Sequence, residues 1–177
     1  MSHSLSRRAL LALAGLLLAA TLATTASSAS AWNYYAVHAR HSDKCLDVAN
    51  FSYVHGADVI QGNCWGGRNQ QWAFVRIGPG DGFYEIHARH SGKCLDVANA
   101  SNAHGANVLQ ADCRGSYNQQ WYLVATDSGY YRIIARHSNR CLDVANLSIA
   151  HGADVVQGTC WAPGPNQQWR LEYMATA

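Results

Sequence analysis

The chain has 177 residues, of which 49% are hydrophobic and 14% are charged, against about 25% charged residues in an average globular domain. This composition excludes a disordered chain and a nucleic-acid binder that works through strong positive charge. The formal net charge is +2, but we expect a segment that holds Arg7 and Arg8 to be removed, which leaves eleven basic residues against eleven acidic ones. The remaining chain, with 6 Cys, 6 Trp and 9 Tyr, is expected to be a near-neutral extracellular β domain.

The first 31 residues have the layout of a secretory signal peptide. Arg7 and Arg8 precede an apolar run over 9–20, and small residues lead to Ala29-Ser30-Ala31, which is an A-x-A cleavage site. The apolar run is shorter than the roughly 20 residues that span a membrane, so we expect cleavage rather than anchoring. The paired arginines leave open whether export is general or twin-arginine. We therefore predict a secreted mature chain over 32–177, which has no later apolar run.

Three copies of one sequence unit follow. Each copy carries Ala-Arg-His-Ser, Cys-Leu-Asp-Val-Ala-Asn, His-Gly-Ala, a second Cys and Asn-Gln-Gln-Trp, in that order. The first Cys of the copies are Cys45, Cys94 and Cys141, 49 and 47 residues apart, and the second Cys always follows 19 residues later. Agreement at so many positions indicates three structural repeats, which we place at about 32–77, 78–125 and 126–177.

Four short strands are expected in each repeat. In the first repeat they fall at 34–39, 44–49, 58–64 and 70–77, because Val, Ile, Tyr and Phe are frequent there and Gly, Asn and Asp separate the segments. The next two repeats open with strands at 83–88 and 130–135. No stretch has sustained helical periodicity. Three units of four strands favour a closed threefold β structure over a propeller, which usually has about four or more blades.

This pattern resembles the ricin-type lectin family, the carbohydrate-binding β-trefoils with Q-x-W repeats. The motifs that carry the resemblance are Cys-Leu-Asp-Val and Asn-Gln-Gln-Trp, each present three times in register. The resemblance extends over nearly all of 32–173. It implies an all-β fold, a β-trefoil of about twelve strands with pseudo-threefold symmetry, and one sugar site in each repeat.

The cysteines are expected to form structural disulfides, because an exported chain has an even number of them. Six cysteines allow fifteen pairings, and the threefold repetition favours the pairing within each repeat. These pairs are Cys45–Cys64, Cys94–Cys113 and Cys141–Cys160. A metal site is disfavoured, because there is no C-x-x-C motif.

The disulfides also predict where the aspartates lie. If Cys45 faces Cys64 across antiparallel strands, the two-residue period of a strand places Asp47 opposite Gly62. Leu46 and Val48 then point into the core. The same reasoning pairs Asp96 with Ala111 and Asp143 with Gly158. Each carboxylate is thus expected on the outer face, beside a small hollow.

The resemblance assigns the sugar contacts to side chains that recur in every repeat. A carboxylate accepts hydrogen bonds from sugar hydroxyls, and an amide both donates and accepts. The Asp and Asn are expected to bind hydroxyls, and the Gln to add contacts or brace the site. The predicted residues are Asp47, Asn69 and Gln70, Asp96, Asn118 and Gln119, and Asp143, Asn166 and Gln167. The tryptophans of the same motif, Trp72, Trp121 and Trp169, are expected to pack in the core.

One departure from the family concerns the aromatic residue that stacks on the sugar. The family usually has it two residues before the second Cys, where this chain has Gly62, Ala111 and Gly158. We hypothesise that Trp65 and Trp161, which directly follow Cys64 and Cys160, replace it. The second repeat has Arg114 there.

Catalytic and metal functions are disfavoured. The repeated histidines, His41, His90, His137, His55, His104 and His151, are interpreted as hydrogen-bonding turn residues. Glycoside hydrolysis needs two opposed carboxylates and each repeat offers one regular Asp, while no cysteine is left over as a nucleophile. We expect no catalytic residues, no cofactor and no metal.

The sequence therefore predicts a secreted, non-catalytic lectin with up to three weak sugar sites, whose partners are glycans and not nucleic acid. The alternative is a protein-binding or inhibitory β-trefoil whose sugar sites have decayed. The missing aromatic residue favours that alternative, and the three retained Asp–Asn pairs favour the lectin. The sugar and the number of working repeats stay open.

Overall fold

The computed structural model describes residues 31–176. The signal peptide expected over 1–31 falls outside the described residues except for Ala31. Within the described part of the chain, no helix is long and apolar enough to cross a membrane.

The described chain forms twelve strands joined by turns, six of which are short 3-10 turns. The strands are β1 (Asn33–Ala39), β2 (Cys45–Val48), β3 (Ala57–Gly62), β4 (Gln71–Arg76), β5 (Phe83–Ala88), β6 (Cys94–Val97), β7 (Ala106–Ala111), β8 (Gln120–Ala125), β9 (Tyr130–Ala135), β10 (Cys141–Val144), β11 (Ala153–Gly158) and β12 (Trp169–Thr176). The 3-10 turns are η1 (Ala49–Phe51), η2 (Arg68–Gln70), η3 (Ala98–Ala100), η4 (Tyr117–Gln119), η5 (Ala145–Leu147) and η6 (Pro165–Gln167).

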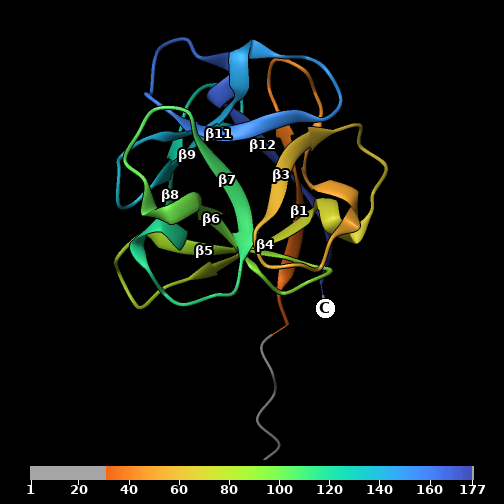
Figure 1. The fold of residues 1–177 in the computed structure, drawn as a ribbon, viewed down its shortest axis with the longest axis vertical. Coiled ribbons are helices and arrows are strands. Elements are labelled where there is room, and N and C mark those ends of the chain that lie inside the picture. The colour runs from red at the N-terminus through yellow and green to blue at the C-terminus, as the bar shows by residue number, and fades with distance from the viewer. Residues whose placement is uncertain (1–30, 177) are drawn as a thin grey trace, which may run out of the picture. The chain divides into compact units, whose positions relative to one another are not determined.

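Six of the strands close into a barrel. Strand β1 pairs with β12 and β4, β5 pairs with β4 and β8, and β9 pairs with β8 and β12, all antiparallel. The other six form the hairpins β2–β3, β6–β7 and β10–β11. Strands β3, β7 and β11 also pair with one another in a triangle, which faces the viewer in Figure 1. A closed barrel leaves no free strand edge. This arrangement of three four-stranded units is the predicted β-trefoil.

The strand positions expected from the sequence agree with the structure to within two residues at each end. The openings of the second and third repeats are the strands β5 and β9, with the expected ends. The 3-10 turns were not predicted, because three residues are too few to show a helical period. These turns carry two of the residue types of the candidate site.

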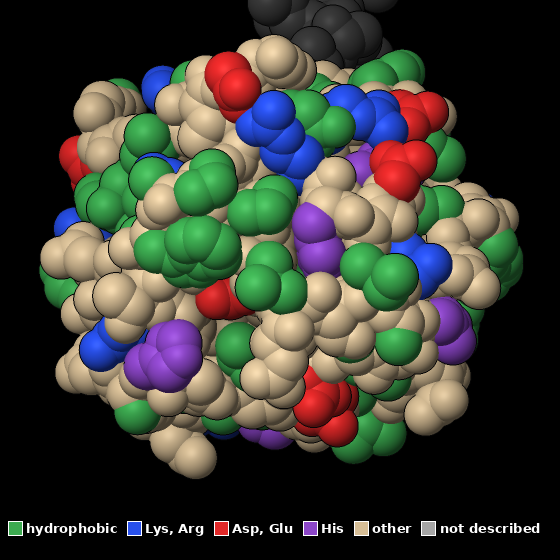
Figure 2. Space-filling view, turned by 90° about the horizontal axis from the view of Figure 1, so that it is seen from above, with side chains coloured by type: hydrophobic (Ala, Val, Ile, Leu, Met, Phe, Trp, Pro, Cys, Tyr) green, Lys and Arg blue, Asp and Glu red, His purple; other side chains and the backbone are tan. Residues whose placement is uncertain are grey.

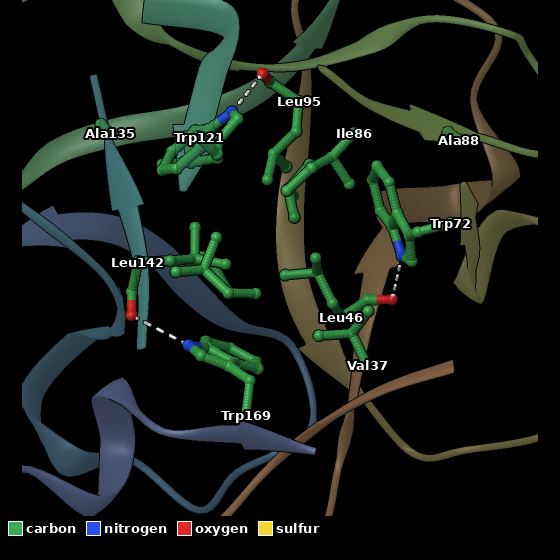
Figure 3. Close-up of a cluster of buried hydrophobic side chains, with 14 of the residues drawn as sticks. Val37, Leu46, Trp72, Ile86, Ala88, Leu95, Trp121, Ala135, Leu142 and Trp169 are labelled. Carbon is green, nitrogen blue, oxygen red and sulfur yellow. Dashed lines mark hydrogen bonds between the residues drawn. The ribbon is translucent and has the colours of Figure 1, made fainter. Parts of the chain in front are cut away.

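The barrel interior is filled by side chains that recur in the three repeats. Leu46 and Val48 are fully buried, as the strand period predicts, and so are their counterparts in β6 and β10. The motif tryptophans Trp72, Trp121 and Trp169 are also fully buried, which confirms their expected core role. Each donates its Nε1–H to the carbonyl of the leucine in the same repeat (Figure 3), at 2.9 Å for Trp72 and Leu46. The indole N–H is thus satisfied inside an otherwise apolar core.

The three disulfides pair within each repeat as expected. They join Cys45 to Cys64, Cys94 to Cys113 and Cys141 to Cys160. Each links the start of a hairpin to the loop that leaves it. Among the described residues no cysteine is free.

Candidate functional site

Each repeat builds one hydrogen-bonded group from an aspartate, an asparagine and a glutamine. The aspartate lies on the second strand of the repeat, and the two amides come from the 3-10 turn before the fourth strand. In the first repeat Asn69 Nδ2 donates to Asp47 Oδ1 at 2.6 Å, and Gln70 Nε2 donates to Asp47 Oδ2 at 2.7 Å. The same bonds join Asp96 to Asn118 and Gln119, and Asp143 to Asn166 and Gln167. The structure therefore brings each predicted Asp, Asn and Gln together.

The glutamine has the geometry of a brace. In the first repeat Gln70 Nε2 also donates to the carbonyl of Asn63 at 2.8 Å, and its Oε1 accepts from the backbone N–H of Trp65 at 3.0 Å. Gln70 is fully buried, so it ties the aspartate to the loop that carries Trp65.

The asparagine keeps one polar atom without a protein partner. Its two amide hydrogens go to Asp47 Oδ1 and, at 3.2 Å, to the carbonyl of Val48. Its Oδ1 is buried and has no hydrogen-bond partner within the protein, and the same is true of Asn166 Oδ1. A buried acceptor without a partner costs free energy unless a ligand or water satisfies it.

The predicted strand register was wrong by two residues. Cys45 pairs with Gly62, so that Asp47 pairs with Ile60, and the other repeats pair Asp96 with Leu109 and Asp143 with Val156. The error arose because Cys64 lies beyond the end of β3, where the strand period no longer applies. Gly62 is still next to the carboxylate, since a Cβ at Gly62 would lie 2.4 Å from Asp47 Oδ2. The space beside Gly62, which was expected to be a hollow, is therefore filled by the Asp47 carboxylate.

Burial raises the pKa of the three aspartates above the ordinary value. Asp47 is only 5% exposed. Loss of hydration raises its pKa, and the hydrogen bonds from Gln70 and Asn69 partly oppose this rise. The pKa of Asp96 and of Asp143 is raised for the same reason. Carboxylates whose charged form is disfavoured by burial are typical of functional sites, and here they occur at three equivalent positions.

A pocket lies beside each carboxylate, and in the second repeat Ala111, which stands at the position of Gly62, is part of its lining. The first, second and third pockets, named by the repeat that supplies the aspartate, have volumes of about 350, 410 and 500 Å³. Each is lined by the aspartate and asparagine of the group and by the aliphatic residue that pairs with the aspartate. These lining residues are Asp47, Asn69 and Ile60, Asp96, Asn118 and Leu109, and Asp143, Asn166 and Val156.

Each pocket also contains a histidine from the preceding repeat, where the third repeat counts as preceding the first. His151 lines the first pocket, His55 the second and His104 the third. In each ring Nδ1 accepts a backbone N–H at 3.1 Å, from Asn63, Asp112 and Thr159 respectively. Nε2 therefore carries the ring hydrogen and is left as a donor. The sequence showed these histidines as repeated turn residues, but not that each belongs to a neighbouring pocket.

A second missed residue type is the asparagine after the Asp-Val-Ala motif. Asn50, Asn99 and Asn146 are exposed and line the three pockets. They have φ near +56°, in the left-handed region that asparagine tolerates better than most residues. Their repetition directly after the aspartate strand was the available signal.

The hypothesised stacking residues lie at the pockets. Trp65 lines the first pocket and Trp161 the third. They are 64% and 42% exposed, and Arg114 takes the equivalent place in the second pocket. On the face seen from above, Figure 2 shows a group of hydrophobic side chains with charges of both signs around it.

The remaining repeated histidines join the repeats. His41, His90 and His137 donate from Nε2 to the carbonyls of Ser148, Ser52 and Ser101, at 2.8, 2.8 and 3.0 Å. They thus make the hydrogen bonds expected of turn histidines.

Two other histidines lie against disulfides. His38 and His87 lie within 3.6 Å of Cys64 Sγ and 3.5 Å of Cys113 Sγ. These sulfurs are in disulfide bonds and are not the thiolates that a metal prefers.

The fold, the repeats and the three pockets together define a β-trefoil of the lectin type. The sequence model of the family described as "Ricin-type beta-trefoil lectin domain-like" matches residues 22–111, 69–158 and 117–177. The chain therefore belongs to this family. Among curated proteins, no sequence match was found.

Solved structures with the same fold include designed and natural proteins. The designed threefold-symmetric protein ThreeFoil is 53% identical, with a TM-score of 0.77, over 80% of this chain and 99% of that one. An exo-β-1,3-galactanase from Clostridium thermocellum is 33% identical with a TM-score of 0.77, over 80% of this chain but only 30% of that one. A ricin B-like lectin from Macrolepiota procera, solved with lactose, is 19% identical over 81% of this chain and 96% of that one, with a TM-score of 0.69.

Proposed function

We propose that the chain is a secreted, non-catalytic lectin that binds one sugar unit in each of its three pockets. The observation that carries this proposal is the threefold recurrence of one polar set beside a pocket: a carboxylate, an asparagine with spare hydrogen-bonding capacity and a histidine N–H. Sugars present vicinal hydroxyls that need such a mixture of acceptors and donors.

The proposed contacts follow from the hydrogen bonds already made. Each oxygen of Asp47 accepts one amide hydrogen and keeps capacity for a hydroxyl. Asn69 Oδ1 would accept a second hydroxyl, and the Nε2–H of His151 would donate to a sugar oxygen. Gln70 acts through Asp47 and the loop, not on the sugar. Trp65 and Trp161 would cover the apolar C–H face of the sugar in the first and third pockets.

Open pockets of this kind predict weak individual sites. Three sites on one rigid domain can engage a multivalent glycan together, so their combined affinity exceeds that of any one site. Secretion is part of the proposal, supported by three disulfides of the kind that persist in oxidising compartments. Sequencing the exported protein from its N-terminus tests it, with Trp32 as the expected first residue.

A glycan array tests the lectin function. We would compare the wild type with a triple variant, Asp47→Asn, Asp96→Asn and Asp143→Asn, on glycans that include lactose, N-acetylgalactosamine and β-1,3-galactans. Asn keeps the shape of Asp and removes the charge, and near-ultraviolet circular dichroism verifies folding. The matched control changes three exposed aspartates outside the pockets, Asp58, Asp81 and Asp154, to Asn.

The lectin proposal predicts wild-type and control binding that the triple variant loses. Binding that survives in the folded triple variant contradicts the proposed sites. Absence of wild-type binding to every glycan would favour the alternative, a protein-binding or inhibitory trefoil, which draws its support from the missing family aromatic.

A further inference from the structure

The three pockets have different walls, although their polar groups recur. The difference lies in the loop that follows the aspartate strand, at the first and third positions after the pocket asparagine. The first repeat has Phe51 and Tyr53 there, the second has Ala100 and Asn102, and the third has Leu147 and Ile149. At these two loop positions the first repeat thus has aromatic rings, the second has small and polar side chains, and the third has aliphatic ones.

The aromatic residues of the first repeat form a continuous row. Phe51 and Trp65 both line the first pocket, with ring centroids 6.2 Å apart. Tyr53 is the next ring, 6.0 Å from Phe51 and 60% exposed. The same loop goes on to His55, which lines the second pocket. The row therefore extends beyond the first pocket, because Phe51 and Trp65 line this pocket and Tyr53 does not.

The rings of this row are held in place by neighbouring groups. His90 packs edge-on against both Phe51 and Tyr53 at 5.0 Å, and its own Nε2 is fixed by the carbonyl of Ser52. At the other end the Trp65 ring lies so close over Gly67 that a Cβ there would be 2.2 Å from it. Rigid, exposed aromatic rings give a large contact area at a low entropic cost, as in other binding surfaces.

The backbone of this loop is the same in the three repeats. Phe51 has φ +54°, and the equivalent residues Ala100 and Leu147 have φ +48° and +53°. The first repeat differs only in the side chain that this shared conformation presents, which is an aromatic ring that lines the first pocket together with Trp65.

We propose that the row Trp65–Phe51–Tyr53 is an extended subsite, in which Tyr53 stacks on the second sugar ring of an oligosaccharide whose first ring lies in the first pocket. This inference rests on the proposed lectin function. The occupant is a saccharide chain because the row continues a pocket lined with hydroxyl-binding groups, and because uncharged rings match the C–H faces of successive sugars. The first repeat then prefers chain segments, whereas the second and third accept single units.

Nuclear magnetic resonance can measure each pocket separately. The indole N–H signals of Trp65 and Trp161 report on the first and third pockets, and single Trp→Phe variants assign them. The probes are the monosaccharide and the trisaccharide of the linkage series that gives the strongest array signal. We expect the trisaccharide to bind at Trp65 about fivefold more tightly than the monosaccharide, from one added ring contact, and to show no such preference at Trp161.

The key variant is Tyr53→Asn, which installs the residue of the second repeat at an exposed position. It should remove the trisaccharide preference at Trp65 and leave monosaccharide affinity there unchanged. Ile149→Asn, the matched change in the third repeat, should leave the Trp65 titrations unaltered. Grafting the row onto the second repeat, by Ala100→Phe, Asn102→Tyr and Arg114→Trp, should create a trisaccharide preference there.

The outcomes separate the two proposals. Equal affinity for both probes at Trp65, or a preference that survives Tyr53→Asn, overturns the extended subsite and leaves the lectin function standing. If no glycan binds at any pocket, the lectin function fails and the subsite fails with it.

Discussion

At the scale of single residues, the candidate site depends on positions where a side chain is missing. Gly67 is one of them. A Cβ at Gly67 would lie 2.2 Å from the Trp65 ring and 2.6 Å from Asn69 Oδ1. Its backbone is ordinary extended chain, with φ −64°. The glycine is therefore required by crowding and not by backbone conformation.

Gly67→Ala should displace both Trp65 and Asn69. We expect it to weaken binding at the first pocket about tenfold and to lower the free energy of unfolding by roughly 1–3 kcal/mol, the usual cost of overpacking. The Trp65 indole signal and urea unfolding measure the two effects. The matched control is Ser116→Gly in the second repeat, where Arg114 replaces the tryptophan and stability should change by less than about 1 kcal/mol. If Gly67→Ala changed neither binding at the first pocket nor the free energy of unfolding, Trp65 would not need its present position.

The raised pKa values of Asp47, Asp96 and Asp143 predict that sugar binding weakens in acid. Each carboxylate must be ionised to accept both amide hydrogens and a hydroxyl, and a protonated carboxyl loses acceptor capacity. Because burial raises these pKa values above the ordinary 3.8, affinity should fall at a higher pH than an exposed aspartate would give. Affinity measured between about pH 7 and about pH 4 tests this. Asp81→Asn should leave the pH profile unchanged.

The same three aspartates should make the folded protein more stable in acid, although they weaken sugar binding there. A folded-state pKa above the unfolded value means that the folded protein holds the proton more tightly. The contribution of these aspartates to stability is then greatest below the unfolded pKa and is lost as pH rises through the folded pKa. Relative to the triple Asp→Asn variant, the wild type should gain stability as the pH is lowered toward 4. Urea unfolding of both proteins at each pH measures the difference, and a relative loss in acid would contradict the assigned pKa directions.

At the scale of elements, the strands could be predicted from the sequence, but the register of the hairpins and the short turns between the strands could not. Strand β5 (Phe83–Ala88) was predicted with its observed ends, because aromatic and β-branched residues are frequent there and turn residues border the segment. The position of Asp47 opposite Gly62 was wrong, because the strand period was extended past the end of β3 to Cys64. The turns that hold Asn69 and Gln70 are too short to leave a periodic signal. Local pattern therefore gives strands, and the geometry between them needs the structure.

Each disulfide stabilises one hairpin, and in the first and third repeats it also fixes the loop that carries a pocket tryptophan. Trp65 directly follows Cys64, which is bonded to Cys45 at the start of β2. Replacing both cysteines with alanine should cost roughly 3 kcal/mol of unfolding free energy, the value for a closed loop of about 20 residues. Urea unfolding measures it. The control is removal of the Cys94–Cys113 pair, which closes a loop of the same length. Its removal should lower the unfolding free energy by as much, without changing the Trp65 titration. A loss below about 1 kcal/mol would contradict the chain-entropy argument.

At the scale of the whole molecule, every pocket is assembled from two repeats. Asp47 of the first repeat shares its pocket with His151 of the third, and Asp143 of the third shares its pocket with His104 of the second. The circle closes because β3, β7 and β11 pair with one another. The sequence shows three equal copies, and reading each copy alone would place each histidine with the aspartate of its own repeat. Only the closure of the trefoil shows that each histidine lies in the pocket of the following repeat.

This arrangement predicts a crossed effect of two histidine substitutions. His151→Ala should weaken binding at the first pocket, reported by Trp65, and leave the third pocket unchanged although His151 lies in the third repeat. His104→Ala should do the reverse, weakening binding at Trp161 and sparing Trp65. Loss of one neutral hydrogen bond gives about a two- to tenfold decrease in affinity. Both side chains are exposed, so stability should stay within about 1 kcal/mol. If His151→Ala instead weakened binding at Trp161, in the pocket of its own repeat, the histidine would act through the fold of that repeat and not as a ligand of the neighbouring site.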